Sequence, residues 1–128
     1  FALAGGAEVL AVEGAADQVQ ALIAARNAAR RSKIETQERD LERRPLAGAE
    51  LAPFDAVIFD PPRAGAKRQA AALAASEVPT VLAVSCNPAT FARDAQTLVQ
   101  GGYRLLSLTP VDQFPWSRHL ELAARFQR

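Results

Sequence analysis

The segment from Val78 to Thr90 constrains the fold of this chain more than any other. An apolar run, Val78 to Val84, leads directly into Ser85-Cys86-Asn87 and then Pro88. Proline suits the first turn of a helix because its missing N–H has no helical partner there. The order therefore predicts a buried strand, a tight turn and a helix. In an open α/β sheet, functional residues collect at the carboxyl ends of strands, so the turn at Cys86 is the first candidate site.

The rest of the chain alternates between apolar runs typical of buried strands and segments with helical spacing. The expected strands are residues 8–13, 33–37, 54–60, 78–84, 103–111 and 119–126, and the expected helices are residues 17–31, 66–76 and 88–100. This alternation predicts an α/β fold, with a mostly parallel sheet and helices on both faces. No helix separates the last two strands, so we expect them to form an antiparallel hairpin at one edge.

The composition is that of an ordinary globular chain, with 49% hydrophobic and 23% charged residues among 128. This length suits one domain or part of one. A net charge of +1 provides no overall field for nucleic acid, so such binding depends on a local patch. One cysteine and one histidine argue against a disulfide or a metal site. Without a membrane-spanning run or a secretory signal, a cytoplasmic location is expected.

Candidate site residues lie at or just after the carboxyl ends of four of the expected strands: Glu13, Asp40, Asp60 and Cys86. The carboxyl ends of parallel strands line one rim of a sheet, so we expect these side chains to converge. Glu13 suits hydrogen bonds from ribose hydroxyls, or it caps a turn. Asp40 suits contact with an adenine amino group, or it is a solvated acid in a charged run.

The segments around Asp60 and Glu121 offer further candidates. Two prolines after Asp60 form a rigid loop, which either mounts a side chain against a planar substrate or simply ends the strand. Arg63 in this loop contacts phosphate or is solvated. His119 and Glu121 share one face of the last strand. A carboxylate there can remove a proton from a bound base, or the pair lies on an exposed strand face.

Local sequence leaves two interpretations of Cys86 open. Free cysteine is among the most buried residue types, which favours a small packed side chain. Its position just before a helix favours a reactive thiolate, because the helix dipole stabilises negative charge there.

Three motifs, taken in order, resemble those of the RNA 5-methyluridine methyltransferases, which use S-adenosylmethionine to methylate carbon 5 of uridine in transfer or ribosomal RNA. The motifs are Asp60-Pro61-Pro62-Arg63-Ala64-Gly65, Ser85-Cys86-Asn87-Pro88-Ala89-Thr90, and Asp112-Gln113-Phe114-Pro115 with His119-Leu120-Glu121. The resemblance extends from about Glu8 to the end of the chain. It implies a Rossmann-like class I methyltransferase fold, with a mostly parallel sheet and a carboxyl-terminal antiparallel hairpin.

The resemblance also implies a role for each candidate. Cys86 is the nucleophile that adds to carbon 6 of uracil, and Glu121 is the base that removes the proton from carbon 5. Asp60 holds the uracil and stabilises the adduct. The implied cofactor-binding residues are Glu13, Asp40 and Asp60, and the implied substrate-binding residues are Asp60, Arg63, Asn87 and His119. Covalent addition makes carbon 5 electron-rich enough to accept a methyl group, and the target base must leave its stack.

Parts of the family pattern have no counterpart in residues 1–128. The first, central strand of the family's sheet and its glycine-rich cofactor loop are expected just before Phe1. The chain then corresponds to the carboxyl-terminal part of a catalytic domain. We expect this part to bind the cofactor weakly and to be inactive alone, and self-association is one way to complete its sheet. An accessory RNA-binding domain and an iron–sulfur cluster, which some members carry, have no counterpart here.

Two alternatives stay open. One is a methyltransferase with another target, although RNA 5-methylcytosine enzymes typically carry cysteine where Arg63 stands, and amino-group enzymes begin this loop with asparagine. The other is a non-catalytic nucleic-acid-binding remnant that uses a patch of arginines. The arginines are those at positions 26, 30, 31, 39, 43 and 44. Acidic residues are interleaved with them, which is typical of a solvated face.

Overall fold

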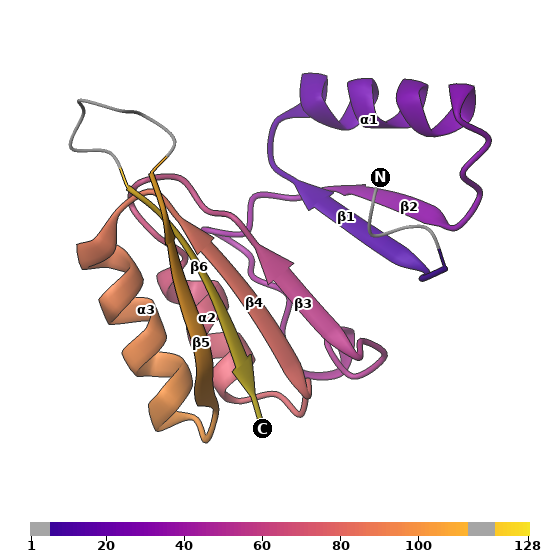
Figure 1. Ribbon diagram of the computed structural model, residues 1–128. Coiled ribbons are helices and arrows are strands. Elements are labelled where there is room, and N and C mark those ends of the chain that lie inside the picture. Colours follow the sequence, from indigo (N-terminus) through magenta and orange to yellow (C-terminus); the bar gives the residue numbers. More distant parts are fainter. Residues whose placement is uncertain (1–5, 113–119) are drawn as a thin grey trace. The chain divides into compact units, whose positions relative to one another are not determined.

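The computed structural model describes residues 6–112 and 120–128, which belong to two compact units (Figure 1). Unit 1 extends to Arg44 and contains strand β1 (Val9–Glu13), helix α1 (Ala16–Ala28) and strand β2 (Ile34–Glu38). The two strands pair in parallel from Val9↔Ile34 to Glu13↔Glu38. Helix α1 connects them and packs on them, with Val19 and Ile34 buried between.

Unit 2 begins at Pro45 and contains a four-stranded sheet. Its elements are a 3-10 turn (Gly48–Glu50), β3 (Ala56–Phe59), α2 (Lys67–Ala74), β4 (Thr80–Ser85), α3 (Pro88–Gln100), β5 (Arg104–Val111) and β6 (Glu121–Gln127). The strand order is β3-β4-β6-β5. Strands β3 and β4 are parallel, whereas β6 is antiparallel to both β4 and β5. Only β6 therefore runs against the common direction of this sheet.

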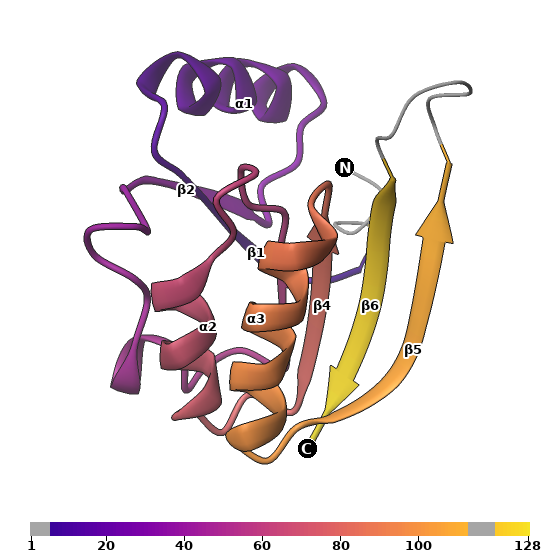
Figure 2. The same ribbon diagram turned by 90° about the vertical axis from the view of Figure 1, so that its left-hand side faces the viewer.

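Helices α2 and α3 pack on each other and cover one face of this sheet (Figure 2). The covered face takes alternate residues of each strand, as the pleat requires. Val81, Ala83 and Ser85 of β4 are buried on it, as are Leu122, Ala124 and Phe126 of β6. Leu73 of α2 and Leu98 of α3 are fully buried against them. The core of unit 2 thus lies between one sheet face and two helices.

The expected order of strands and helices is confirmed, and so is the antiparallel pairing of the last two strands. The expectation of helices on both faces is not met within unit 2. The connections β3–α2–β4 and β4–α3–β5 advance in the same direction along the sheet. Right-handed crossovers that advance in one direction place their helices on the same face. Among the residues of this unit that the structure describes, no helix therefore lies on the other face.

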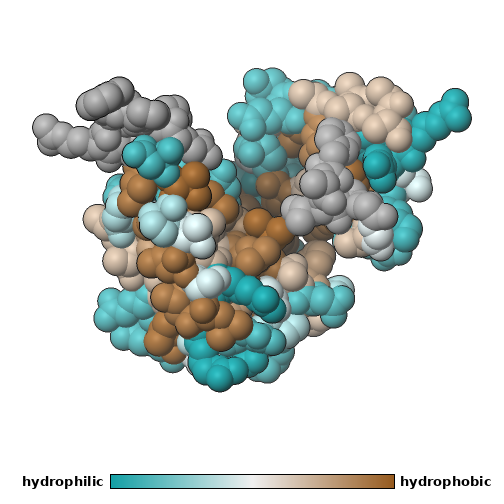
Figure 3. Space-filling model, in the orientation of Figure 1, coloured by the Kyte–Doolittle hydropathy of each residue, from teal (hydrophilic) through white to brown (hydrophobic). Residues whose placement is uncertain are grey.

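Apolar side chains remain exposed on unit 2. They are Ile58 on β3, Val99 on α3, and Leu105, Leu106, Leu108 and Val111 on the edge strand β5. Figure 3 shows apolar surface over this part of the molecule. None of the helices in the described part of the chain is long and apolar enough to cross a membrane.

Candidate active site

Asp60, Cys86 and Glu121 come together at one edge of the sheet in unit 2. Parallel strands β3 and β4 pair as far as Phe59↔Ala83, so Asp60 and Cys86 leave the sheet at the same edge, which is the one formed by the carboxyl ends of these strands. Antiparallel strand β6 begins at this edge, where Ser85 pairs with Leu122. Cys86 directly follows Ser85 and Glu121 directly precedes Leu122, so the two residues flank the last pair of β4 and β6 at this end of the sheet.

The same pairing indicates the face of the sheet to which Glu121 points. Ser85 and Leu122 are buried on the face that the helices cover. By strand alternation, Glu121 points to the opposite face, and Cys86 lies in the turn just beyond the end of β4. Both are half-buried, and Asp60 is exposed. The free thiol of Cys86 is therefore more accessible than a fully packed core side chain.

The turn at Cys86 is shaped by its neighbours. Asn87 is the N-cap of α3, and its side-chain oxygen accepts a hydrogen bond from Ala89 N at 3.1 Å. Ser85 Oγ accepts a hydrogen bond from Asn87 N and donates one to Asn87 O, both at 3.2 Å. Pro88 occupies the first turn, as expected. Cys86 thus directly precedes the amino end of a 13-residue helix, where negative charge is favoured.

The Asp60 loop, residues 60–65, lies against α3. The amide nitrogen of Asn87 donates to Arg63 O at 3.0 Å, so both ends of the Asn87 amide already have structural partners. This observation favours a structural role for Asn87 over the substrate contact implied by the family resemblance. Arg63 is exposed on the same loop. His119 lies outside the described residues.

Sequence reasoning missed two side chains that hold this loop, Thr90 and Asp94. Thr90 Oγ1 donates to Arg63 O at 3.1 Å, and a carboxylate oxygen of Asp94 accepts a bond from Ala66 N at 2.6 Å. With Asn87 they recur at helical spacing on one face of α3. That spacing, together with the polar character of the side chains facing a core, is the signal that could have identified them.

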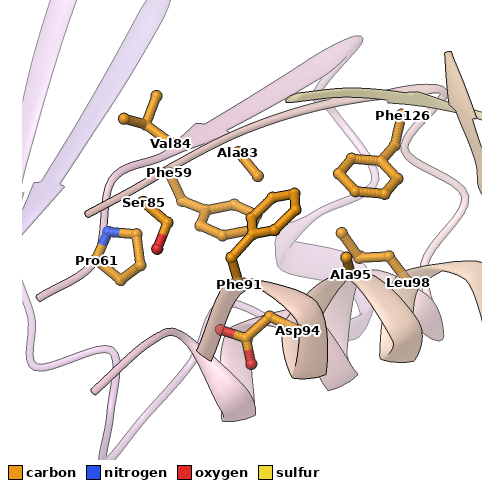
Figure 4. Close-up of a pocket in the computed structure, with 10 residues that line it drawn as sticks. All are labelled: Phe59, Pro61, Ala83, Val84, Ser85, Phe91, Asp94, Ala95, Leu98 and Phe126. Atoms are coloured by element: carbon orange, nitrogen blue, oxygen red, sulfur yellow. The ribbon is translucent and has the colours of Figure 1, made fainter. Parts of the chain in front are cut away.

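A small cavity lies in the core beneath this edge (Figure 4). Phe59, Phe91 and Phe126 fill most of the space between the strands and α3, and Asp94 lies at its border. The cavity measures about 10 Å³, which is room for at most one water molecule. None of Asp60, Cys86 and Glu121 lines it. The cavity is too small for a nucleobase.

Glu13 and Asp40 lie together at the carboxyl edge of the sheet in unit 1. Arg39 N donates to Glu13 O at 2.9 Å, and a Cβ on Gly14 would lie 3.6 Å from Asp40 Cα. One carboxylate oxygen of Glu13 accepts a bond from Ala15 N at 2.9 Å, which is the turn-capping role. For its other oxygen, no hydrogen bond is found within residues 6–112 and 120–128. Glu13 is half-buried and retains this acceptor.

Asp40 is used mainly by its own loop. One of its oxygens accepts bonds from Glu42 N at 2.9 Å and Arg43 N at 3.2 Å, and the other lies 3.5 Å from Arg43 Nε. The Arg43 side chain is 89% exposed, so this ion pair contributes little stability. These contacts favour the solvated-loop interpretation of Asp40. In the described part of the chain, no group of three or more His, Cys, Asp or Glu side chains is arranged to hold a metal ion.

The strand order of unit 2, with one antiparallel strand inserted before the last parallel one, is that of a Rossmann-like class I methyltransferase. The tRNA (uracil-54, C5)-methyltransferase of Pyrococcus abyssi, solved in complex with S-adenosyl-L-homocysteine, has a similar structure, with a TM-score of 0.76 and 25% sequence identity. The match covers 94% of this chain and 34% of that one. The fold is therefore that of the class I S-adenosylmethionine-dependent methyltransferases.

Sequence comparison gives the family. The family model for tRNA (uracil-5-)-methyltransferase matches residues 9–128, so the chain belongs to that family, whose cofactor is S-adenosylmethionine. An uncharacterized RNA methyltransferase of Mesorhizobium japonicum is 52% identical over 95% of this chain and 30% of its own length. The 23S rRNA (uracil(1939)-C(5))-methyltransferase of Chromohalobacter salexigens is 43% identical over 90% and 24%. The chain thus spans less than a third of these two relatives.

Proposed function

We propose that the protein containing this chain transfers a methyl group from S-adenosylmethionine to carbon 5 of a uridine in RNA, through a covalent adduct of Cys86. The observation that supports the proposal is that Cys86 and Glu121 flank the last pair of β4 and β6, Ser85↔Leu122, at the end of the sheet where β3 leads to Asp60. Membership of the uracil-5 methyltransferase family supports the same reaction. Residues 1–128 are then one part of the catalytic domain.

Two acidic side chains in unit 1, Glu13 and Asp40, suit contacts with the nucleoside part of the cofactor. Glu13 has a carboxylate oxygen without a described partner at a strand end, which fits a ribose hydroxyl donor. Asp40 lies beside it, although one of its oxygens already accepts two backbone bonds and the other lies near Arg43 Nε. When bound, S-adenosylmethionine supplies an electrophilic methyl group on a sulfonium sulfur.

The chemistry proceeds by addition and elimination on the uracil ring. The thiolate of Cys86 forms a bond to carbon 6, and the electron pair of the ring double bond moves onto the carbonyl oxygen at carbon 4. Carbon 5 would then accept the methyl group that bound S-adenosylmethionine supplies, with S-adenosylhomocysteine as the leaving group. Glu121 removes the proton from carbon 5, the ring double bond re-forms, and the thiolate leaves. The Asp60 carboxylate holds the ring by accepting a bond from the uracil N3–H.

The identity of the methylated base tests the proposal. The full-length protein, incubated with S-adenosylmethionine and unmodified transfer or ribosomal RNA, is expected to produce 5-methyluridine. Nucleoside mass spectrometry of the digested RNA measures it. A methyl group on cytosine or on an exocyclic amine would overturn the uracil assignment. An absence of methylation in both RNA classes would favour the non-catalytic nucleic-acid-binding alternative.

Replacing Glu13 by glutamine tests the cofactor contact. The variant keeps an oxygen for Ala15 N but loses the charge that strengthens a bond from ribose, so affinity is expected to fall by about tenfold. Calorimetric titration of the full-length protein with S-adenosylhomocysteine measures it, and the exposed Glu35→Gln in β2 is the matched control. Equal affinities for the two variants would contradict the assignment.

We also propose that residues 1–128 alone bind the cofactor weakly and are inactive. The same titration would refute this proposal by showing that residues 1–128 bind S-adenosylhomocysteine tightly.

A further inference from the structure

The Asp60 loop and the turn at Cys86 are joined by a set of contacts that the reaction itself does not require. Arg63 O accepts bonds from both Asn87 and Thr90, at 3.0 and 3.1 Å. Thr90 Oγ1 also lies 3.2 Å from Asn87 O, in the first turn of α3. One threonine hydroxyl thus contacts the backbone of both segments, and each of those segments carries a residue assigned to the chemistry.

The same loop is fixed at its far end by a buried charge. Asp94 is 4% exposed, although an unpaired carboxylate is costly to bury. Its partners are Ala66 N at 2.6 Å and the Arg93 guanidinium at 2.8 and 2.9 Å. Arg93 in turn donates to Ala64 O at 3.0 Å. These charge-assisted bonds connect α3 to the end of the loop.

Gly65 shows how closely the loop approaches the helix. It is buried and has a φ of +81°, a conformation that other residues rarely adopt. A Cβ at this position would lie 2.5 Å from Arg93 Nη2 and 2.6 Å from Asp94 Oδ2. Within the loop, Gly65 N donates to Pro62 O at 2.8 Å, and the two prolines restrict the remaining backbone. The Asp60 loop is therefore held from both sides.

We propose that Thr90 and Asp94 are positioning residues, which fix the Asp60 loop against α3 and so set the place of Asp60 relative to Cys86. The inference rests on the proposed function, because it assigns them a role in that same site. Small displacements of a catalytic group are costly, since the rate depends on near-attack geometry. Neither side chain needs to touch the RNA or the cofactor for this effect.

Thr90→Val is the test, because valine keeps the shape and removes the hydroxyl. In the full-length protein, kcat is expected to fall about tenfold, with KM for RNA within about twofold, because the lost bond affects alignment more than binding. Thr90→Ser restores the hydroxyl and is expected to restore kcat. Thr97→Val is the matched control, because the Thr97 hydroxyl of the same helix bonds only to Arg93 O, at 3.1 Å, among the described contacts.

Hydrogen exchange of residues 60–66 gives a readout independent of catalysis. It is expected to be faster in Thr90→Val than in Thr97→Val. Wild-type protein that methylates uridine, with equal kcat for the two valine variants, would overturn this inference alone. Faster exchange with unchanged kcat would also overturn it, since a looser loop would not matter. Wild-type protein that methylates no uridine overturns the proposed function, and this inference with it.

Discussion

Replacing Cys86 by alanine is expected to abolish methylation of uridine RNA, with a loss of at least about 1000-fold in kcat. Without the thiolate, carbon 5 of uracil is too poor a nucleophile to take a methyl group. RNA that contains 5-fluorouridine should trap the wild-type protein, because the base cannot remove fluorine from carbon 5 as it removes a proton. The measurement is the protein–RNA adduct on a denaturing gel and its mass.

The Cys86→Ala variant should form no such adduct while binding RNA with wild-type affinity. Cys86→Ser keeps the size of the side chain and should also fail, because its oxygen is a far weaker nucleophile at neutral pH. A trapped adduct in the full-length Cys86→Ala protein would assign the bond to another residue. That result, or methylation by the alanine variant at the wild-type rate, would contradict the role of Cys86.

Much of this fold could be predicted because its signals are local. The run from Val78 to Val84 is apolar and is followed by an N-cap and a proline, so strand β4 and helix α3 begin and end close to where they are expected. The face of the sheet on which α2 and α3 pack could not be predicted from local sequence. It depends on the direction in which successive crossovers advance, and strand order is set by contacts between distant segments.

The candidate site likewise combines residues that local sequence identifies with an arrangement that depends on distant segments. Each acid at a strand end was identifiable alone, but the placement of Cys86 and Glu121 at the same end of the sheet depends on the pairing of β4 with β6, which are separated by two other elements. Before the structure, only the family resemblance linked them. The buried Asp94 was not predictable, because a charged helical residue is usually solvated and its partner Ala66 is distant in sequence. Asn87 was a candidate for substrate contact through the family resemblance, and its bond to Arg63 O was not predictable because the two residues are 24 positions apart.

Replacing Glu121 by glutamine is expected to stop the reaction after methyl transfer, not before it. The amide has nearly the same shape but cannot accept the proton from carbon 5, so turnover should fall by about 100- to 10,000-fold. Cys86 then has no route to leave, because elimination requires that proton to be removed. The covalent protein–RNA adduct should accumulate on ordinary uridine RNA and should carry the transferred methyl group.

The stalled adduct distinguishes a base from a residue that merely supports the sheet. Glu121 is half-buried at the first position of β6, so a structural role would lower adduct formation and turnover together. Glu77→Gln is the control, since Glu77 is an exposed glutamate of the same unit, before β4. It should turn over normally and leave no adduct. Release of 5-methyluridine RNA by Glu121→Gln at the wild-type rate would assign proton removal to another residue. The position of Glu121 at the start of β6 would then have no catalytic meaning.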